Sequence, residues 1–238
     1  MQILVVDDGS NTVSRPEYSE LQPFLNKNIE LDILYLPSNQ GITKALNAGL
    51  DYILSSAIPY SFIARLDCGD LAVGNRFFLQ ENFLAENQSI DLVGSWVKFN
   101  NEANEYLFSV TPPITHKSIR KKMSIRCSFI HPSVMYRRSM VENLGMYPEY
   151  EAAEDYAYFF DAVRKTRTAN IPGFLTVVEM NKGGISSKKR FTQNMNKLRI
   201  INRFSKRNIY FFMGVAYNVG LICMPGKLVN RTKRLLLR

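Results

Sequence analysis

The sequence of 238 residues contains few cysteines, two histidines and one tryptophan, and its C-terminal part contains no acidic residue. The cysteines are three in number, widely spaced and without a CxxC or CxxH pair: Cys68, Cys127 and Cys223. This pattern excludes a disulfide scaffold and the usual zinc-binding motifs. We therefore expect a reducing compartment, the cytoplasm.

Long hydrophobic runs are also missing. The first apolar run, Ile3–Val6, is followed at once by two aspartates and has no basic region before it, which argues against a signal peptide. The longest uncharged stretch is Ile209–Met224, whose 16 residues end at Pro225. A membrane-spanning helix needs roughly 20 apolar residues. An interfacial helix, a short span and a buried helix all remain open for this segment.

Charge is unevenly distributed along the chain. The 30 Lys and Arg residues exceed the 21 Asp and Glu residues by nine, but 14 of the basic residues follow Asn181, where no acidic residue occurs. Residues 1–180 therefore carry a net charge of −5, and the tail alone makes the protein basic. We expect the tail to lie on an anionic membrane surface, since apolar and basic residues together favour that location. A buried helix with merely solvated basic residues is the alternative.

The hydrophobic pattern alternates between strands and helices, which is typical of an α/β protein with an open sheet. Apolar runs predict strands at 2–6, 31–36, 61–66, 92–99, 133–136 and 176–179. Helical spacing predicts helices at 16–27, 41–54, 76–87, 114–123, 154–165 and 188–207. Ligands of such sheets bind at the carboxyl ends of the strands, and acidic pairs follow two of the predicted strands there.

Four motifs occur in a fixed order: VVDDGS at 5–10, NQGITKALNAG at 39–49, RLDCGD at 65–70, and HPSVMYRRS at 131–139 followed by AEDYAYFF at 153–160. This ordered set resembles the family 2 glycosyltransferases, especially their bacterial polysaccharide and lipopolysaccharide members. The resemblance implies a GT-A fold, a Rossmann-like open mixed sheet flanked by helices, at residues 1–205. An apolar helix and polybasic tail at 206–238 would follow it.

The resemblance implies a nucleotide site built from the first two motifs. Asp7 and Asp8, with Asp8 favoured, would accept hydrogen bonds from a uracil-type base and from ribose. Asn39, Gly41 and Asn47 would shape the same pocket. The alternative for the two aspartates is a tight turn in which the side chains cap their own backbone.

Further contacts with the donor follow from the resemblance. Arg65 would face the diphosphate, and Lys182 would belong to a loop that closes over it. His131 would lie in the site as a metal ligand or phosphate contact, whereas a core histidine is the structural alternative. We expect the donor to be a nucleoside diphosphate sugar.

A divalent metal ion, Mn²⁺ or Mg²⁺, would stabilise the departing diphosphate, and Asp67 and Asp70 would supply its protein ligands. The commonest family pattern places the second carboxylate where this chain has Gly69, so Asp70 would have to take over that role. A solvated acidic turn is the alternative interpretation.

The proton acceptor would lie in the last motif. By resemblance Asp155 is the general base that removes the proton of the acceptor hydroxyl, and Glu154 orients it or contacts the acceptor. Carboxylates in a first helical turn are also stabilised by the helix dipole, which is the structural alternative for both residues.

Members of the family usually begin with a strand and a helix before the strand that ends in DDGS. We expect the missing strand to leave backbone groups of the strand at 2–6 unpaired. A misplaced start, a truncated inactive product and a rearranged sheet are the three explanations.

The sequence thus predicts an inverting glycosyltransferase that uses a UDP-sugar and a glycan or lipid-linked acceptor in cell-surface polysaccharide synthesis. It would be cytoplasmic and peripheral on the inner face of the cytoplasmic membrane. The alternative is a truncated, inactive relative that serves as an accessory protein. We expect no nucleic-acid partner, because the body is acidic and no such binding motif occurs.

Overall fold

The computed structural model describes residues 1–11, 13–180 and 189–224. The chain divides into two compact units, each of which is described by itself. The first comprises Met1–Tyr60 with Met146–Glu149, and the second comprises Ser61–Gly145 with the residues from Tyr150 onward.

The first unit is built on two parallel strands, β1 (Gln2–Asp7) and β2 (Glu30–Tyr35), which pair residue for residue. The helix α2 (Ile42–Ser55) packs on one face of this sheet. Its Gly49 allows the close approach, since a Cβ there would lie 3.0 Å from a methyl carbon of Val6. Within the described residues β1 pairs with β2 only, so its other edge has no strand partner, as expected from the sequence.

The helix predicted at 16–27 is shorter than expected. The structure has a single helical turn, α1 (Tyr18–Leu21), followed by the 3₁₀ turn η1 (Gln22–Phe24). Pro23 explains the early end, because it lacks a backbone N–H and its ring clashes with the preceding turn of an α-helix.

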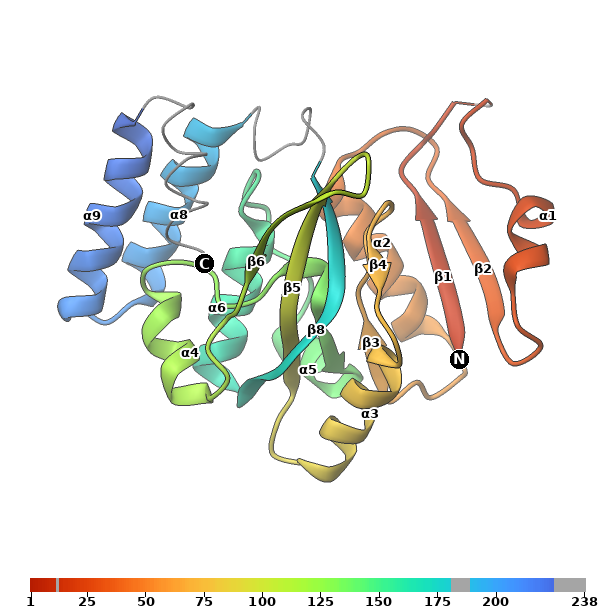
Figure 1. Ribbon diagram of the computed structural model, residues 1–238, viewed down its shortest axis with the longest axis horizontal. Coiled ribbons are helices and arrows are strands. Elements are labelled where there is room, and N and C mark those ends of the chain that lie inside the picture. The colour runs from red at the N-terminus through yellow and green to blue at the C-terminus, as the bar shows by residue number, and fades with distance from the viewer. Residues whose placement is uncertain (12, 181–188, 225–238) are drawn as a thin grey trace. The chain divides into compact units, whose positions relative to one another are not determined.

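The second unit contains a mixed six-stranded sheet with the order β3-β7-β5-β8-β4, and β6 pairs with β5 (Figure 1). Its strands are β3 (Phe62–Ala64), β4 (Leu71–Ala72), β5 (Leu92–Asn101), β6 (Tyr106–Val110), β7 (Met135–Arg137) and β8 (Thr168–Met180). Only β5 and β8 are parallel neighbours, and the other pairs are antiparallel. The mixed sheet agrees with the predicted fold class.

Helices surround this sheet and close its core. They are α3 (Arg76–Glu86), α4 (His116–Met123), α5 (Arg138–Leu144), α6 (Glu154–Lys165), α8 (Arg190–Phe204) and α9 (Ile209–Cys223), with a 3₁₀ turn, η2 (His131–Ser133). The core centres on α6, which buries Tyr156, Phe159 and Phe160 and packs against α4 and α8. Burial of such aromatic side chains supplies much of the stability of a domain.

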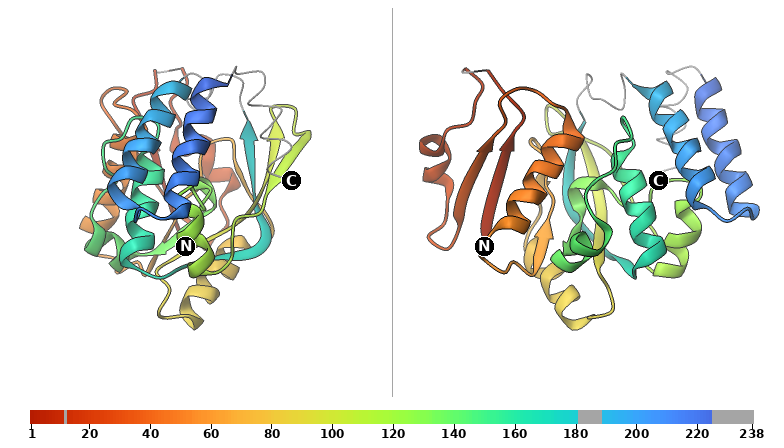
Figure 2. Two further views of the ribbon diagram at one scale, coloured as in Figure 1. Left: turned by 90° about the vertical axis from the view of Figure 1, so that its left-hand side faces the viewer. Right: turned by 180° about the vertical axis from the view of Figure 1, so that it is seen from behind.

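The last two helices, α8 and α9, lie side by side (Figure 2). The sequence predicts a domain boundary between residues 205 and 206. The helix α8 ends before this boundary and α9 begins after it, so the two packed helices lie on opposite sides of the predicted boundary. In the described part of the chain, no helix combines the length and apolar character needed to cross a bilayer.

Candidate active site

The turn after β1 is held by a carboxylate, Asp8, in the first unit. Its two oxygens accept hydrogen bonds of 2.8 Å from the backbone N–H groups of Gln40 and Gly41. Gly41 is the N-cap of α2 and Gln40 precedes it, so the carboxylate lies at the N-terminal end of the helix, where a negative charge is favoured. Gly9 is required here because a Cβ would lie only 2.2 Å from the carbonyl carbon of Ser38. Asp8 therefore fixes the first two motifs of the sequence against each other.

Asp7 is the last residue of β1 and is only 6% exposed. Its carboxylate accepts a hydrogen bond of 3.2 Å from the backbone N–H of Ser10 and lies 3.9 Å from Nε of Arg15. The guanidinium of Arg15 covers the ring of Tyr35 at 4.0 Å from the ring centroid. The buried acid thus faces a cation and an aromatic ring at the carboxyl end of the sheet, and the nearby Asn39 is exposed to solvent.

Asn47 makes two hydrogen bonds to one backbone unit. Its Nδ2 donates to the carbonyl of Tyr147 at 2.9 Å, and its Oδ1 accepts from the N–H of the same residue at 2.8 Å. The side-chain amide therefore attaches residues 146–149 to α2. Its direct contribution is to hold the first unit together.

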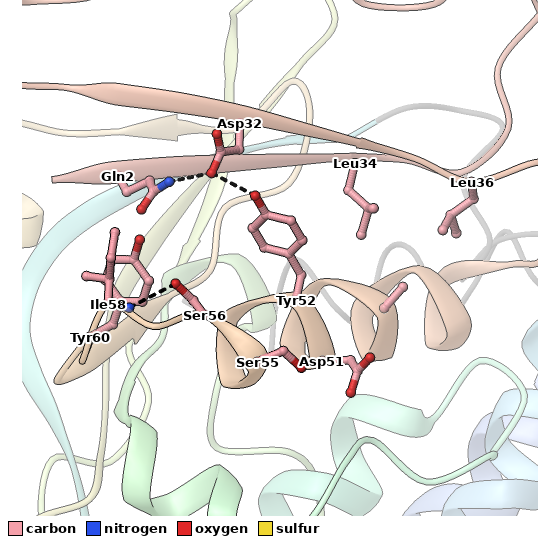
Figure 3. A pocket seen from close by; sticks show the side chains of 11 residues that line it. Gln2, Asp32, Leu34, Leu36, Asp51, Tyr52, Ser55, Ser56, Ile58 and Tyr60 are labelled. Atoms are coloured by element: carbon pink, nitrogen blue, oxygen red, sulfur yellow. Dashed lines mark hydrogen bonds between the residues drawn. The ribbon is translucent and has the colours of Figure 1, made fainter.

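A cavity of about 660 Å³ lies between β2 and α2 in the first unit. Figure 3 shows Tyr52 pointing from α2 to Asp32, which accepts hydrogen bonds from the Tyr52 hydroxyl at 3.0 Å and from Gln2. None of the eleven lining residues is a candidate site residue from the sequence. The candidate catalytic residues therefore lie outside this cavity, in the loops and at the start of α6.

In the second unit, the acidic loop after β3 contains an ion pair. Nη2 of Arg65 lies 2.7 Å from Oδ1 of Asp67, although that oxygen accepts no hydrogen bond of good geometry. Asp70 closes the turn with its N–H on the carbonyl of Asp67, and its Oδ1 accepts a 2.9 Å hydrogen bond from the N–H of Glu179. Burial raises the pKa of Asp70 to about 6, although the hydrogen bond from Glu179 lowers it in part.

The loop depends on a fully buried cation, Arg76, at the first position of α3. Its Nη2 donates to the carbonyls of Arg65 at 2.8 Å and Val134 at 3.3 Å, and its Nε donates to Gln80 at 2.9 Å. Gln80 in turn donates to the carbonyl of Ser133. We call Arg76 and Gln80 the α3 clamp, because together they tie the acidic loop to η2.

Arg76 remains charged although burial lowers its pKa to about 10. The negative charge of Asp70 opposes this shift, which places the two groups within each other's field. Nη1 of Arg76 has no hydrogen-bond acceptor among the described residues. The α3 clamp is thus a buried charge held by neutral carbonyls and one nearby carboxylate.

His131 begins η2, and its ring packs edge-on against Phe159 of α6 with centroids 5.7 Å apart. Burial and the positive charge of Arg65 lower the pKa of His131 to about 3. Its imidazole is therefore neutral at pH 7, the form that can ligate a metal or accept a hydrogen bond.

Two carboxylates open α6, as the sequence predicts. Glu154 is 7% exposed, and burial together with the charge of Asp155 raises its pKa to about 7. Its Oε2 is buried and has no hydrogen-bond donor among the described residues. Burial also raises the pKa of Asp155, against the opposing charge of Lys197 on α8. Both acids are therefore stronger proton acceptors than ordinary carboxylates.

One electrostatic field joins the acidic loop to α6, because the charge of Asp67 raises the pKa of both Glu154 and Asp155. Among the described residues, no three acidic, histidine or cysteine side chains form a complete metal site. However, Glu154 Oε2 is a buried oxygen without a hydrogen-bond donor among the described residues, and Asp67 Oδ1 is paired with the guanidinium of Arg65. Hard oxygens of this kind fit Mn²⁺ or Mg²⁺ when phosphate oxygens complete the ligand sphere.

The structure thus brings six of the predicted site residues together in the second unit. They are Arg65, Asp67, Asp70, His131, Glu154 and Asp155. Lys182 lies outside the described residues. The sequence analysis missed the α3 clamp and the proximity of Lys197 to Asp155, since neither belongs to a recognisable motif.

Comparison with protein families gives a match over residues 1–145 to the model described as "Glycosyl transferase family 2". An uncharacterised glycosyltransferase of Haemophilus influenzae is 28% identical over 84% of this chain and 72% of its own length. The amylovoran biosynthesis glycosyltransferase AmsE of Erwinia amylovora is 23% identical over 79% of this chain and 70% of its own. An Escherichia coli UDP-Gal:alpha-D-GlcNAc-diphosphoundecaprenol beta-1,3-galactosyltransferase is 25% identical over 68% of this chain and 56% of its own.

Two solved structures have the same fold. The mannosyltransferase PcManGT of Pyrobaculum calidifontis, in complex with GDP-Man and Mn²⁺, superposes with a TM-score of 0.60 at 17% identity. GalNAc-T7 with UDP, GalNAc and Mn²⁺ superposes with a TM-score of 0.62 at 12% identity. The alignments cover 99% and 98% of this chain but only 65% and 48% of those chains. The GT-A fold predicted from the sequence is confirmed.

The α3 clamp leads to a first prediction. Replacing Arg76 with Ala leaves two carbonyls and Gln80 without their donor, so we expect the free energy of unfolding to fall by about 3 kcal/mol or more. Urea denaturation measures this loss. Lys165→Ala is the matched control, because it breaks a surface ion pair with Asp161 and should cost less than about 1 kcal/mol. Equal losses in both variants would contradict the structural role of the clamp.

Glu154 leads to a second prediction. Its raised pKa means that the folded protein favours the protonated acid, so its contribution to stability is complete below about pH 4.5 and is lost as the pH rises through about 7. Glu154→Gln removes this loss and should stabilise the protein by about 1–3 kcal/mol at pH 8 but much less at pH 5. Urea denaturation at both pH values, with Glu142→Gln as a surface control, tests this. A gain that does not depend on pH would refute it.

Proposed function

The chain belongs to glycosyl transferase family 2, and we propose that it transfers a sugar, with inversion, from a UDP-sugar to a glycan or lipid-linked acceptor in cell-surface polysaccharide synthesis. The observation that carries this proposal is the pair of carboxylates that opens α6, in which Glu154 is buried and its Oε2 has no hydrogen-bond donor among the described residues. The relatives named for amylovoran synthesis and for galactosyl transfer to a diphosphoundecaprenol-linked sugar support the choice of pathway and acceptor.

We assign nucleotide recognition to the first unit. Asp7 and Asp8 would bond the base and ribose, with Asn39 and Gly41 forming the pocket wall, and Asn47 would act indirectly by holding residues 146–149. The hydrogen bonds from Gln40 and Gly41 to Asp8 support this assignment, because they fix the carboxylate before the ligand arrives. A preorganised group loses little conformational entropy on binding.

Asp67 and Asp70 would hold a divalent metal together with diphosphate oxygens, and the metal, when bound, would neutralise the charge of the leaving diphosphate. The ion pair of Asp67 with Arg65 supports its role, because this carboxylate already accepts a cation. Asp70 would contribute its second oxygen, because the first accepts from Glu179. Arg65, now paired with Asp67, would contact the diphosphate, and neutral His131 would accept a hydrogen bond or ligate the metal beside it.

Asp155 would be the general base. The acceptor hydroxyl oxygen attacks the anomeric carbon, its proton passes to the Asp155 carboxylate, and the bond to the diphosphate breaks with its electron pair leaving on the diphosphate. The raised pKa of Asp155 supports this role, because the proton affinity of the carboxylate is increased. Glu154, whose pKa is about 7, would bond the acceptor or orient the base.

A lipid-linked acceptor would place the enzyme on the inner face of the cytoplasmic membrane, as a peripheral protein attached through its C-terminal region. The basic charge of residues 181–238 supports this location. Lys182 would belong to a loop that closes over the bound diphosphate, as the family resemblance implies.

These roles can be separated by calorimetry and by turnover. Asp67→Asn should weaken Mn²⁺-dependent UDP binding by about tenfold or more, since a metal ligand is lost. Asp155→Asn should bind UDP normally but lose about a hundredfold in turnover, because only the proton acceptor is removed. UDP binding is measured by titration calorimetry, and turnover by hydrolysis of UDP-glucose, UDP-galactose and UDP-N-acetylglucosamine.

Asp161→Asn is the matched control, because Asp161 lies on the same helix and pairs with Lys165 on the surface. It should leave binding and turnover unchanged. Full turnover by the Asp155 variant would sink its assignment as the base. UDP binding without any turnover by the wild type would instead favour the inactive accessory protein.

A further inference from the structure

The helix α9 has no charged residue in its 15 positions, and it begins at a defined point. The side chain of Asn208 accepts hydrogen bonds from the N–H groups of Tyr210 at 3.0 Å and Phe211 at 3.2 Å, which caps the first turn. A helix that is apolar all round is usually buried on all sides. The position of α9 in the second unit departs from this rule.

One face of α9 is firmly packed. Gly214 lies so close to the end of α4 that a Cβ would be 1.8 Å from the carbonyl oxygen of Ser124. Asn218, on the same face, is buried and donates to the carbonyls of Ile125 at 3.2 Å and Gly214 at 2.8 Å. The orientation of α9 about its own axis is therefore fixed by its packing.

The opposite face is apolar and exposed. The side chains at helical spacing along it are Ile209, Phe212, Met213, Ala216, Val219 and Cys223, which we call the α9 stripe. Exposure reaches 65% for Ile209, 60% for Phe212, 49% for Met213 and 43% for Val219. Figure 2 shows α9 beside α8 at the margin of the second unit. A contiguous apolar stripe of this kind indicates a surface that binds something.

Cations border the α9 stripe, and acidic residues do not. Lys206 and Arg207 are exposed immediately before α9. Lys121 of α4 lies 5.6 Å from the ring centroid of Tyr210, in the first turn of α9. No Asp or Glu occurs in α4, α8 or α9. Long basic side chains can extend along an apolar surface and place their charge in a layer of anionic headgroups.

We infer that the α9 stripe is a lipid-binding surface that inserts into one leaflet of an anionic bilayer, while Lys206 and Arg207 contact the headgroups. The inference deepens the proposed function, and its biological meaning rests on it, because a lipid-linked acceptor lies in the same leaflet. A protein groove would satisfy the apolar residues, but the exposed cations Lys206 and Arg207 at the start of the stripe, and the absence of acidic residues from α4, α8 and α9, favour anionic lipid. The bond network of Gly214 and Asn218 keeps the stripe facing outward.

The inference is tested by co-sedimentation of the full chain with vesicles of phosphatidylcholine alone or with 30% phosphatidylglycerol, about one lipid in three being anionic. The double variant Phe212→Gln/Val219→Gln should bind the anionic vesicles about tenfold more weakly or worse, because apolar burial is lost. The matched control is Phe78→Gln/Leu79→Gln, which changes two exposed apolar side chains on α3 and should bind like the wild type.

Charge reversal tests the second half of the inference. Lys206→Glu/Arg207→Glu should weaken binding to anionic vesicles by about tenfold or more and leave the weak binding to neutral vesicles unchanged. Equal binding of the wild type to both vesicle types would overturn the choice of anionic lipid. If the stripe variant binds vesicles as well as the wild type, the α9 stripe is not the lipid-binding surface. The same conclusion follows if the wild type does not bind vesicles but self-associates through the stripe.

A gain-of-signal variant gives a test that does not depend on loss of binding. Tryptophan fluorescence of Phe212→Trp should shift to the blue and be quenched by bromine-labelled lipid when anionic vesicles are added. No shift would contradict insertion. UDP calorimetry without vesicles distinguishes the two proposals. A stripe variant that binds UDP but not vesicles has lost lipid binding alone. A wild type that binds vesicles but not UDP would refute only the proposed function.

Discussion

The candidate active site depends on one buried cation. Arg76 donates to the carbonyls of Arg65 and Val134, in addition to the backbone hydrogen bond from the Arg65 N–H to the Val134 carbonyl, and Gln80 donates to the carbonyl of Ser133. These carbonyls belong to the acidic loop and to the turn that carries His131. Burying a guanidinium is expensive, and neutral acceptors compensate for it incompletely. The buried charge adds side-chain hydrogen bonds where the pairing of β3 with β7 ends, so the acidic loop and η2 are held beyond the last residues of the ladder.

The carboxylates around this clamp are held in an unfavourable state. Burial raises the pKa values of Asp70, Glu154 and Asp155, and the negative charge of Asp67 adds to each shift. Such strain reduces the stability of the empty protein. It also means that a bound metal ion would reduce the repulsion between these carboxylates. The proton taken from an acceptor hydroxyl would reduce it as well. The electrostatic arrangement that weakens the fold is therefore the one that would favour binding and proton transfer.

The sequence predicted the elements whose residues carry a local signal. The strands that end at Asp7 and before Asp67 and the helix that starts at Glu154 are present, because apolar periodicity and acidic turns are visible over a few residues. The strand predicted at 176–179 extends over Thr168–Met180 instead. Pro172 and Gly173 interrupt its pattern, and in the structure the pairing with β5 shifts register there. β4, β6 and α5 were missed because they are short or lie in polar surroundings.

Long-range contacts explain the rest. In the sequence, Arg76 resembles a solvated residue at the start of a helix. In the structure it is buried and donates to the carbonyl of Val134, which is 58 residues away in the chain. Asn47 lies in a motif that indicates a ligand pocket, yet its amide bonds a backbone unit 100 residues away. No local pattern records either partner. Sequence motifs therefore identified the chemical groups, whereas the groups that position them required the fold.

The helix α8 connects the two functional surfaces of the second unit. Through Lys197 it acts on Asp155, and along its length it packs against α9, whose outer face is apolar. Gly214 and Asn218 fix α9 to the end of α4, and α9 also packs against α8, so a bilayer that binds the stripe would lie beside both helices. The charge that opposes the raised pKa of Asp155 would then lie one helix away from the membrane. If the proposed acceptor is lipid-linked, this arrangement would hold the proposed base at a fixed distance from the surface at which the acceptor lies.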